Sequence, residues 1–425
     1  MKYYSEFIPY TFLSVFLVGL YYLLENKLTK AWMRWAWWVG CLVVVIAIGW
    51  QVGVDHIWAD FGNGYYFAGR NILARPDQLY QGENCGGYVN FPLLAYVFAP
   101  LGRMAKGEAG RIFFLINTVS IMPLAYWLVK FGNLKGWRRW LALFLLAING
   151  PLDYSIWLGN STNLIMLSMI LALWWFERGK DFGAGILLGI NGLIKIPMIL
   201  PAGYYFARRQ WKVVAGGVLA VGVVVVLSLA FTSLSLNRMW LNNCILSFSG
   251  RPVGAFNNQS VAAVLARELI PESGIRYWLP LEPTPLFSAA SRMAVFLLFV
   301  PVIVILLDRW KSPRTKSEHL LEFFMVLVCS LLTSPISWTH YFMFLLIPTA
   351  YYFEDRLLAK GTKGLNLLLL ISLILITTPA DLTLALFDAT GRRGVLSVHF
   401  WGGALFYIFL FALWLRRRKS ALEKS

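Results

Sequence analysis

Charged residues are scarce in this chain. Of its 425 residues, 14% are Asp, Glu, Lys or Arg, whereas 58% are hydrophobic. A soluble domain usually carries about 25% charged residues, so a water-facing surface of normal extent is excluded. Because α-helices satisfy their own backbone hydrogen bonds in lipid, the composition predicts an all-α polytopic membrane protein.

Several motifs of well-known enzymes are also missing. The chain has no Walker A glycine loop, no HExxH, no CxxC pair and no G-x-S-x-G. An Asp-x-Asp pair, which would suit a divalent metal holding a nucleotide-diphosphate sugar, is absent from the predicted outer segments. We therefore expect no metal and no cofactor.

Cysteine is rare, with four residues in the whole chain. Cys41 and Cys329 lie in apolar stretches and are predicted to be core residues. Cys85 and Cys244 fall in two polar segments and could form a disulfide, which would require an oxidising compartment. The sequence leaves this pairing open.

The apolar stretches are long enough to cross a membrane, which takes about 20 residues. We predict about 11 transmembrane helices, near residues 7–24, 35–54, 111–130, 140–158, 162–176, 213–232, 289–308, 319–336, 341–353, 365–380 and 398–415. All belong to one predicted integral-membrane domain, residues 1–425. Residues 183–207 have Lys195 and Pro197 in the middle and basic residues at both ends. This pattern predicts a re-entrant hairpin of two half-helices that meet at 196–197.

The net charge of +17 is concentrated in short connections between these spans. The connections are residues 25–35, 130–140, 177–182, 207–212, 308–322, 354–363 and 416–425. Together they hold 24 of the 38 Lys and Arg residues but 9 of the 21 Asp and Glu residues. Such a bias marks the cytoplasmic side of a membrane, so we expect the C-terminus there and no nucleic-acid partner.

Two long polar segments remain, and both are predicted to lie on the outer side. We call residues 55–110 the first polar segment and residues 233–288 the second polar segment. The aromatic and aliphatic spacing in the first predicts interfacial helices.

The candidate catalytic residues follow the second span. Asp55 and Asp60 lie within the predicted headgroup region, where Trp58 and Phe61 would shield a carboxylate from solvent. A partly desolvated carboxylate has a raised pKa and can act as a general base, and Asp60 is the stronger candidate. The alternative is that both acids end a helix and face water.

Cations and amides could hold an anionic sugar donor. Lys195 lies within the hairpin, where a buried ammonium group needs an anionic partner such as a phosphate. The alternative is that its side chain extends to the membrane interface. Arg251 and the run Asn257-Asn258-Gln259-Ser260 supply donors, or form an ordinary polar loop. His340 beside Trp338 can donate a hydrogen bond, or belong to an aromatic belt.

A set of short motifs in a fixed order resembles glycosyltransferase family 87, the polyprenyl-phosphate-mannose-dependent group with a GT-C fold. The motifs are Asp60-Phe61, Leu79-Tyr80, Phe91-Pro92-Leu93, Ala99-Pro100-Leu101-Gly102, Gly159-Asn160, Leu193-Ile194-Lys195-Ile196-Pro197, Asn258-Gln259-Ser260 and the run from Ser334 to Tyr341. They span roughly residues 35–415.

The resemblance implies a bacterial inner-membrane enzyme that moves a sugar from a polyprenyl-phosphate donor to a glycolipid or glycan acceptor. It implies an inverting, metal-independent transfer on the outer face, with Asp60 as base. Lys195, Arg251 and His340 are expected to bind the donor phosphate. The sugar and acceptor are expected to contact Asp55, Asn258, Gln259, Ser260 and Trp338.

Two departures from the family pattern bear on the substrates. This chain has Gly159-Asn160-Ser161-Thr162 where Gly-Gln and a later Asn are common, and Asn90-Phe91-Pro92-Leu93 where Tyr-Pro-Pro is usual. They leave the identity of the sugar and acceptor open. A polyprenyl-phosphate-arabinose donor and a lipid-sugar transporter or flippase remain the alternatives.

Overall fold

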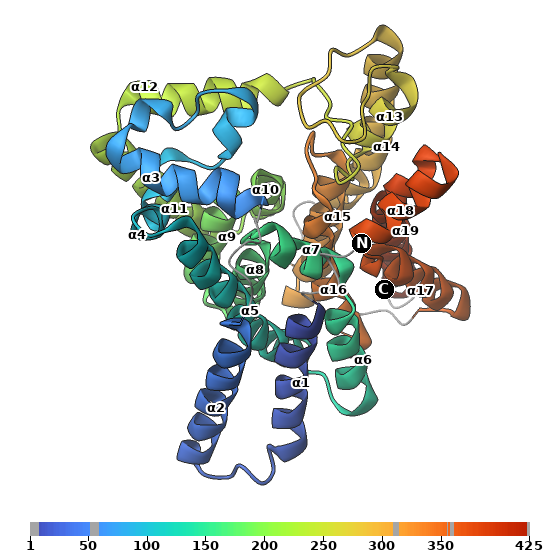
Figure 1. Ribbon diagram of the computed structural model, residues 1–425. Coiled ribbons are helices and arrows are strands. Elements are labelled where there is room, and N and C mark those ends of the chain that lie inside the picture. Colours follow the sequence, from blue (N-terminus) through green and yellow to red (C-terminus); the bar gives the residue numbers. More distant parts are fainter. Residues whose placement is uncertain (1–7, 52–58, 309–313, 355, 358–360, 423–425) are drawn as a thin grey trace.

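The computed structural model describes residues 8–51, 59–308, 314–354, 356–357 and 361–422 (Figure 1). This part of the chain is built from helices and contains no strand. A β-bridge pairs Asn258 with Trp338. The predicted all-α class is confirmed.

The N-terminal half leads from a helical pair, through the first polar segment, to the centre of the molecule. Its helices are α1 (Ile8–Leu24), α2 (Ala31–Gly49), η1 (Phe61–Tyr65), α3 (Tyr66–Ala74), η2 (Pro76–Gln78), η3 (Glu83–Gly87), η4 (Pro92–Leu94), α4 (Ala95–Gly102), α5 (Lys106–Gly132), α6 (Gly136–Ala147), α7 (Gly150–Leu158), α8 (Thr162–Glu177), α9 (Asp181–Ile194), η5 (Ile196–Met198), α10 (Ile199–Ala207) and α11 (Trp211–Phe231).

The C-terminal half begins with the second polar segment and returns to the bundle. Its helices are α12 (Leu234–Met239), η6 (Trp240–Ile245), η7 (Leu246–Phe248), α13 (Val261–Leu269), α14 (Pro285–Leu307), α15 (Lys316–Thr333), η8 (Thr339–Leu345), α16 (Leu346–Phe353), α17 (Lys363–Thr377), α18 (Ala380–Thr390), η9 (Arg393–Ser397) and α19 (Val398–Leu422). Figure 1 shows α3 and α12 at the end of the molecule opposite the α1–α2 turn.

Several of these helices are apolar and long enough to cross a membrane, as predicted. Five qualify singly, namely α2, α5, α11, α14 and a helix over 393–419, and two bent pairs raise the number to seven. The pairs are α6 with α7, bent by 41°, and α17 with α18, bent by 84°. Four shorter apolar helices of 10–17 residues accompany them. The count of about 11 spans stays a prediction.

The predicted hairpin over 183–207 is present. Asp181 at the start of α9 pairs with Lys316 at 2.6 Å, and Arg208 after α10 pairs with Glu322 at 2.8 Å. Because both partners lie in the first turns of α15, the two ends of the hairpin lie together. Lys195, between α9 and η5, is therefore at its tip.

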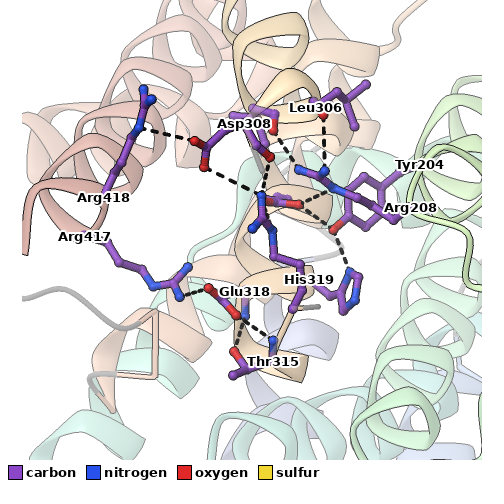
Figure 2. A network of polar contacts seen from close by, with 12 residues as sticks. Tyr204, Arg208, Leu306, Asp308, Thr315, Glu318, His319, Arg417 and Arg418 are labelled. Carbon is purple, nitrogen blue, oxygen red and sulfur yellow. Dashed lines mark hydrogen bonds and ion pairs between the residues drawn. The ribbon is translucent and has the colours of Figure 1, made fainter. Parts of the chain in front are cut away.

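Ion pairs join all seven basic connections to one another. They are Glu25–Arg139, Arg138–Glu354, Arg356–Glu177, Asp181–Lys316, Arg208–Glu322 and Glu318–Arg417. The connections predicted to share one side of the membrane thus lie at one end of the bundle, which we call the basic end. Figure 2 shows how α10, α14, α15 and α19 meet there.

A disulfide joins the two polar segments. Cys85 in η3 is bonded to Cys244 in η6, a pairing that the sequence left open. Around it, the Trp240 Nε1–H donates to the Val89 carbonyl at 3.1 Å, and the Trp240 ring packs edge-on against Phe91. The first and second polar segments therefore form one covalently linked cap.

Candidate active site

The candidate site forms where helices are interrupted. Asp60 immediately precedes the π-helix η1, Asn160 lies in the turn between α7 and α8, and Lys195 is the break between α9 and η5. Gly159 makes the α7–α8 turn possible because its φ of 65° lies in the left-handed region. Irregular backbone of this kind is tolerated in a membrane protein where it is buried or lines a cavity.

One amide links the acid and the cation of this site. Asn160 Nδ2 donates to Asp60 Oδ2 at 2.6 Å, and Lys195 Nζ donates to Asn160 Oδ1 at 2.9 Å. The same Oδ1 accepts from the backbone N–H of Thr162 at 3.1 Å and from its hydroxyl at 2.6 Å. Three donors around one oxygen fix the orientation of the amide, so its NH₂ group faces the carboxylate.

Asp60, the predicted general base, lies in an environment that shifts the pKa of its carboxyl. Burial raises the pKa of the Asp60 carboxyl, because an anion loses hydration there, while the Asn160 hydrogen bond and the charge of Lys195 lower it. Asn160 occupies Oδ2, and Oδ1 has no protein hydrogen-bond partner within the described residues. The carboxylate can therefore accept a proton from a ligand at Oδ1.

Aromatic rings surround the Asp60–Asn160–Lys195 chain. Lys195 Nζ lies 5.2 Å from the centre of the Tyr341 ring. Burial, together with the charge of Asp60, raises the pKa of the Tyr65 hydroxyl to about 12. His340 is buried, and its ring packs edge-on against the Tyr341 ring with the centres 4.8 Å apart. Both of its ring nitrogens lack a hydrogen-bond partner among the described residues.

The amides of the second polar segment serve the fold. Asn258 Nδ2 donates to the carbonyls of Val253 and Pro335, and Gln259 Nε2 donates to those of Phe256 and Leu396. Ser260 caps α13 by accepting from the Ala263 N–H at 3.1 Å. All three side chains are fully buried, so their expected contact with the sugar stays a prediction that this conformation does not display.

The other expected ligand-binding residues lie outside the Asp60–Asn160–Lys195 chain. Arg251 pairs with Glu282 at 2.5 Å on the exposed surface, and Trp338 is half-buried between Ser337 and η8. Asp55 lies outside the described residues, as does Trp58. Within the described ranges, no group of three or more His, Cys, Asp or Glu side chains is arranged to hold a metal ion.

Two features of the site were not predicted from the sequence. Asn160 was noted only as part of a motif, although it joins the acid to the cation. Asn257 bonds to the Tyr154 hydroxyl at 3.1 Å and accepts from Trp278 Nε1 at 2.9 Å, which ties the second polar segment to α7. The Gly159-Asn160 motif, a glycine followed by an amide, was the signal that the sequence offered for Asn160.

Comparison with known proteins finds a matching family. The model of glycosyltransferase family 87 matches residues 88–335, which include Asn160, Lys195 and the second polar segment. Two curated relatives are polyprenol-phosphate-mannose-dependent α-(1-2)-phosphatidylinositol pentamannoside mannosyltransferases. The one from Mycolicibacterium smegmatis is 23% identical over 304 residues, which is 66% of each chain. The one from Mycobacterium tuberculosis is 24% identical over 340 residues, which is 74% of this chain and 72% of its own length.

The chain thus spans about two thirds of the length of the first of these relatives. The family match covers more than half of this chain and extends over the helices that carry two of the three central site residues. With the predicted helical membrane fold, this confirms the resemblance seen in the motifs. The chain belongs to glycosyltransferase family 87.

Proposed function

We propose that this membrane glycosyltransferase moves mannose from a polyprenyl-phosphate donor to a hydroxyl group of a glycolipid or glycan acceptor. The observation that carries the proposal is the Asp60–Asn160–Lys195 chain, which holds a carboxylate and an ammonium group on either side of one amide. A sugar transfer needs a base that takes the proton of the acceptor and a cation that stabilises the departing phosphate. The three hydrogen-bonded side chains supply both.

In the proposed step, the acceptor oxygen attacks the anomeric carbon of the sugar while its proton passes to Asp60 Oδ1. A new carbon–oxygen bond forms, the bond between the anomeric carbon and the phosphate oxygen breaks, and its electron pair leaves with the polyprenyl phosphate. Attack from the face opposite the phosphate inverts the anomeric centre. No metal is required in this step, because the donor carries a single phosphate.

Lys195 and His340 are the proposed partners of the phosphate. The ammonium group of Lys195 stabilises the charge that develops on the leaving oxygen, so it contributes more in the transition state than in the ground state. His340 has two ring nitrogens open to a ligand. Trp338 offers its ring to the sugar. Arg251 is a less favoured phosphate partner because Glu282 already neutralises it.

Mannose is favoured over arabinose because both curated relatives are mannosyltransferases that use a polyprenol-phosphate-mannose donor. Their acceptor is phosphatidylinositol pentamannoside. The departures from the family pattern at Gly159-Asn160 and at Asn90-Phe91-Pro92-Leu93 leave the acceptor open, so we assign it by class, as a glycolipid or glycan.

The proposed location is a bacterial inner membrane, with the site on the non-cytoplasmic face and the C-terminus in the cytoplasm. Two observations support this orientation. The ion pairs gather the Lys- and Arg-rich connections at one end, as the positive-inside bias requires. The Cys85–Cys244 disulfide lies in the polar segments, and such bonds persist in oxidising compartments.

The first test replaces Asp60. Wild type and the Asp60→Asn variant are reconstituted in lipid nanodiscs with chelator, sugar-labelled polyprenyl-phosphate mannose and a panel of glycolipid acceptors. We expect release of polyprenyl phosphate to fall on the order of 10²-fold or more in the variant, because amide nitrogen and oxygen cannot take the proton. The exposed Asp77→Asn variant, in the same polar segment, should retain wild-type turnover.

Near-normal turnover of Asp60→Asn would remove Asp60 from the mechanism. Release from an arabinose donor but not from the mannose donor would correct the sugar. A protein that moves either lipid across the bilayer with the sugar–phosphate bond intact would be the transporter of the alternative interpretation.

A further inference from the structure

A polar cavity lies at the basic end, apart from the candidate active site. It has a volume of about 390 Å³ and opens between the C-terminal ends of α5, α8 and α16. The residues around it are Lys130, Phe131, Asn133, Trp174, Glu177, Arg178 and Arg356. Helix α8 begins beside Asn160 and ends at this cavity, so its 16 residues separate the two sites by about 24 Å.

The cavity holds more positive than negative charge. Glu177 is paired with Arg356, which leaves Lys130 and Arg178 without a carboxylate partner in the described part of the chain. Arg178 has its guanidinium carbon 3.8 Å from the centre of the Trp174 ring, and Lys130 Nζ lies 5.9 Å from the same ring. Lys130 Nζ is closer to the Trp127 ring, at 4.7 Å, so both cations lie over aromatic rings at the rim of the cavity and both reach Trp174.

Capping of helix ends does not account for these cations. The C-terminus of a helix carries partial negative charge and attracts Lys and Arg. Arg356 serves in this way by donating to the Phe131 carbonyl. Lys130 Nζ instead donates to the Tyr126 hydroxyl at 3.3 Å, and the guanidinium group of Arg178, whose backbone N–H bonds to the Trp175 carbonyl, makes no hydrogen bond among the described residues. The donors of Arg178 and two of those of Lys130 remain available to a ligand.

The position of the cavity suits a lipid headgroup. Exposed indoles surround the basic end, since Trp32, Trp35 and Trp137 each present more than half of their surface. Trp at such positions marks the boundary between the acyl chains and the headgroups. Basic pockets between transmembrane helices at the cytoplasmic boundary bind the head groups of anionic lipids.

We propose that this cavity binds the phosphate group of an anionic phospholipid, with Lys130 and Arg178 as its ligands and Trp174 as the surface between them. The proposal depends on the membrane fold and not on the glycosyl transfer. A failure of the transferase assay would therefore not contradict the lipid site, and a failure of the lipid-binding test would not contradict the glycosyl transfer.

The test uses the full chain in a neutral detergent and native mass spectrometry. Phosphatidylglycerol is titrated against phosphatidylcholine with the same acyl chains, for wild type and for the Lys130→Gln/Arg178→Gln double variant. We expect wild type to prefer phosphatidylglycerol. Two lost cations should weaken this binding about 30-fold. The matched control is Lys30→Gln/Lys212→Gln, which removes two exposed cations that do not line the cavity.

A further arm identifies the source of the phosphate. Displacement of the lipid by millimolar glycerol 1-phosphate would assign a phosphate site that serves soluble ligands as well, whereas its failure would assign a lipid site. The Lys130→Arg/Arg178→Lys variant keeps the charge and should keep the preference. Equal binding of both lipids to wild type, or an equal loss in the control pair, would overturn the proposal.

Discussion

At the scale of the residue, Asn160 determines how the carboxylate of Asp60 is held in the candidate site. Its amide donates to one oxygen of Asp60 and accepts from Lys195, so acid and cation are held apart with one neutral group between them. A direct ion pair between Asp60 and Lys195 would stabilise the carboxylate more and weaken it as a base. The amide therefore orients the Asp60 carboxylate while lowering its basicity less than a direct ion pair with Lys195 would.

Removal of this amide should move the pH dependence of the reaction. A base must be ionised, so with Asp60 as the proposed base turnover should fall as the pH drops through its pKa. The Asn160 hydrogen bond lowers that pKa, hence the Asn160→Ala variant should have a higher one, and the acidic limb should move to higher pH. The pH–rate profile of the variant measures this shift. A limb at the wild-type position would show that Asn160 has no influence on the base.

Part of the site could be predicted from the sequence, because some residues are unusual where they stand. Asp60 after a span and Lys195 inside a hairpin are costly in lipid, and both lie at the centre of the site. The amides of Asn258 and Gln259 carry no such signal. Whether an amide faces a ligand or a backbone carbonyl depends on tertiary packing, and here both face carbonyls.

At the scale of the element, the α9–α10 hairpin is positioned by close contact with α11. Gly185 of α9 and Gly216 of α11 lie where the two helices touch. A Cβ atom on Gly185 would collide with the Val213 carbonyl of α11, and one on Gly216 would collide with the Phe182 carbonyl of α9. The absence of side chains lets the two helices approach closely, as is common between membrane helices. Lys195 at the tip is placed by this contact.

A methyl group at this contact should destabilise the protein. The Gly216→Ala variant forces α9 and α11 apart, at a cost of about 1–3 kcal/mol for overpacking. The control is Gly222→Ala on the same helix, where nothing lies within 4 Å of the new Cβ and alanine gains helix propensity. Thermal unfolding in detergent should give a lower transition temperature for Gly216→Ala alone. Equal transitions for both variants would contradict the close contact.

The predicted spans and the observed helices differ mainly where helices bend. The span expected over 140–158 is divided at Asn149, which caps α7 by accepting from the Leu152 N–H at 2.9 Å. The span expected over 365–380 ends at Thr377, and the chain turns at Pro379 into α18. Hydropathy averages over about 19 residues and passes through such breaks, although the Asn149-Gly150-Pro151 and Thr378-Pro379 sequences contain local signals for them.

At the scale of the whole molecule, buried charges join the helices at the basic end. Glu322 accepts from Arg208 at 2.8 Å, from Arg314 at 3.1 Å and from the Tyr204 hydroxyl at 2.8 Å. Asp308 continues the network to α19 through Arg418 at 3.3 Å, as Figure 2 shows. Helices from both halves of the chain are therefore held by one carboxylate-centred cluster.

Neutralising Glu322 should be costly. The Glu322→Gln variant leaves the buried guanidinium group of Arg208 without a counter-charge and Arg314 with Asp308 alone, and breaking such a buried pair costs about 3–5 kcal/mol. The control is Glu354→Gln, whose pair with Arg138 is partly exposed and worth less than about 1 kcal/mol. Thermal unfolding should separate the two variants clearly. A transition of Glu322→Gln within a degree of that of the control would rule out a central role for the cluster.

The Cys85–Cys244 bond also bears on how the protein is made and handled. It closes a ring of chain in which the two cysteines are 159 residues apart, so it cannot form until synthesis has passed Cys244. Until that moment the first polar segment, which contains Asp60, is joined to the second through the main chain alone and has no cross-link to it. A protease cut inside the ring would leave two fragments that migrate as one species on a gel until a reductant is added. Preparation with a strong reductant would therefore remove the cross-link between the two polar segments.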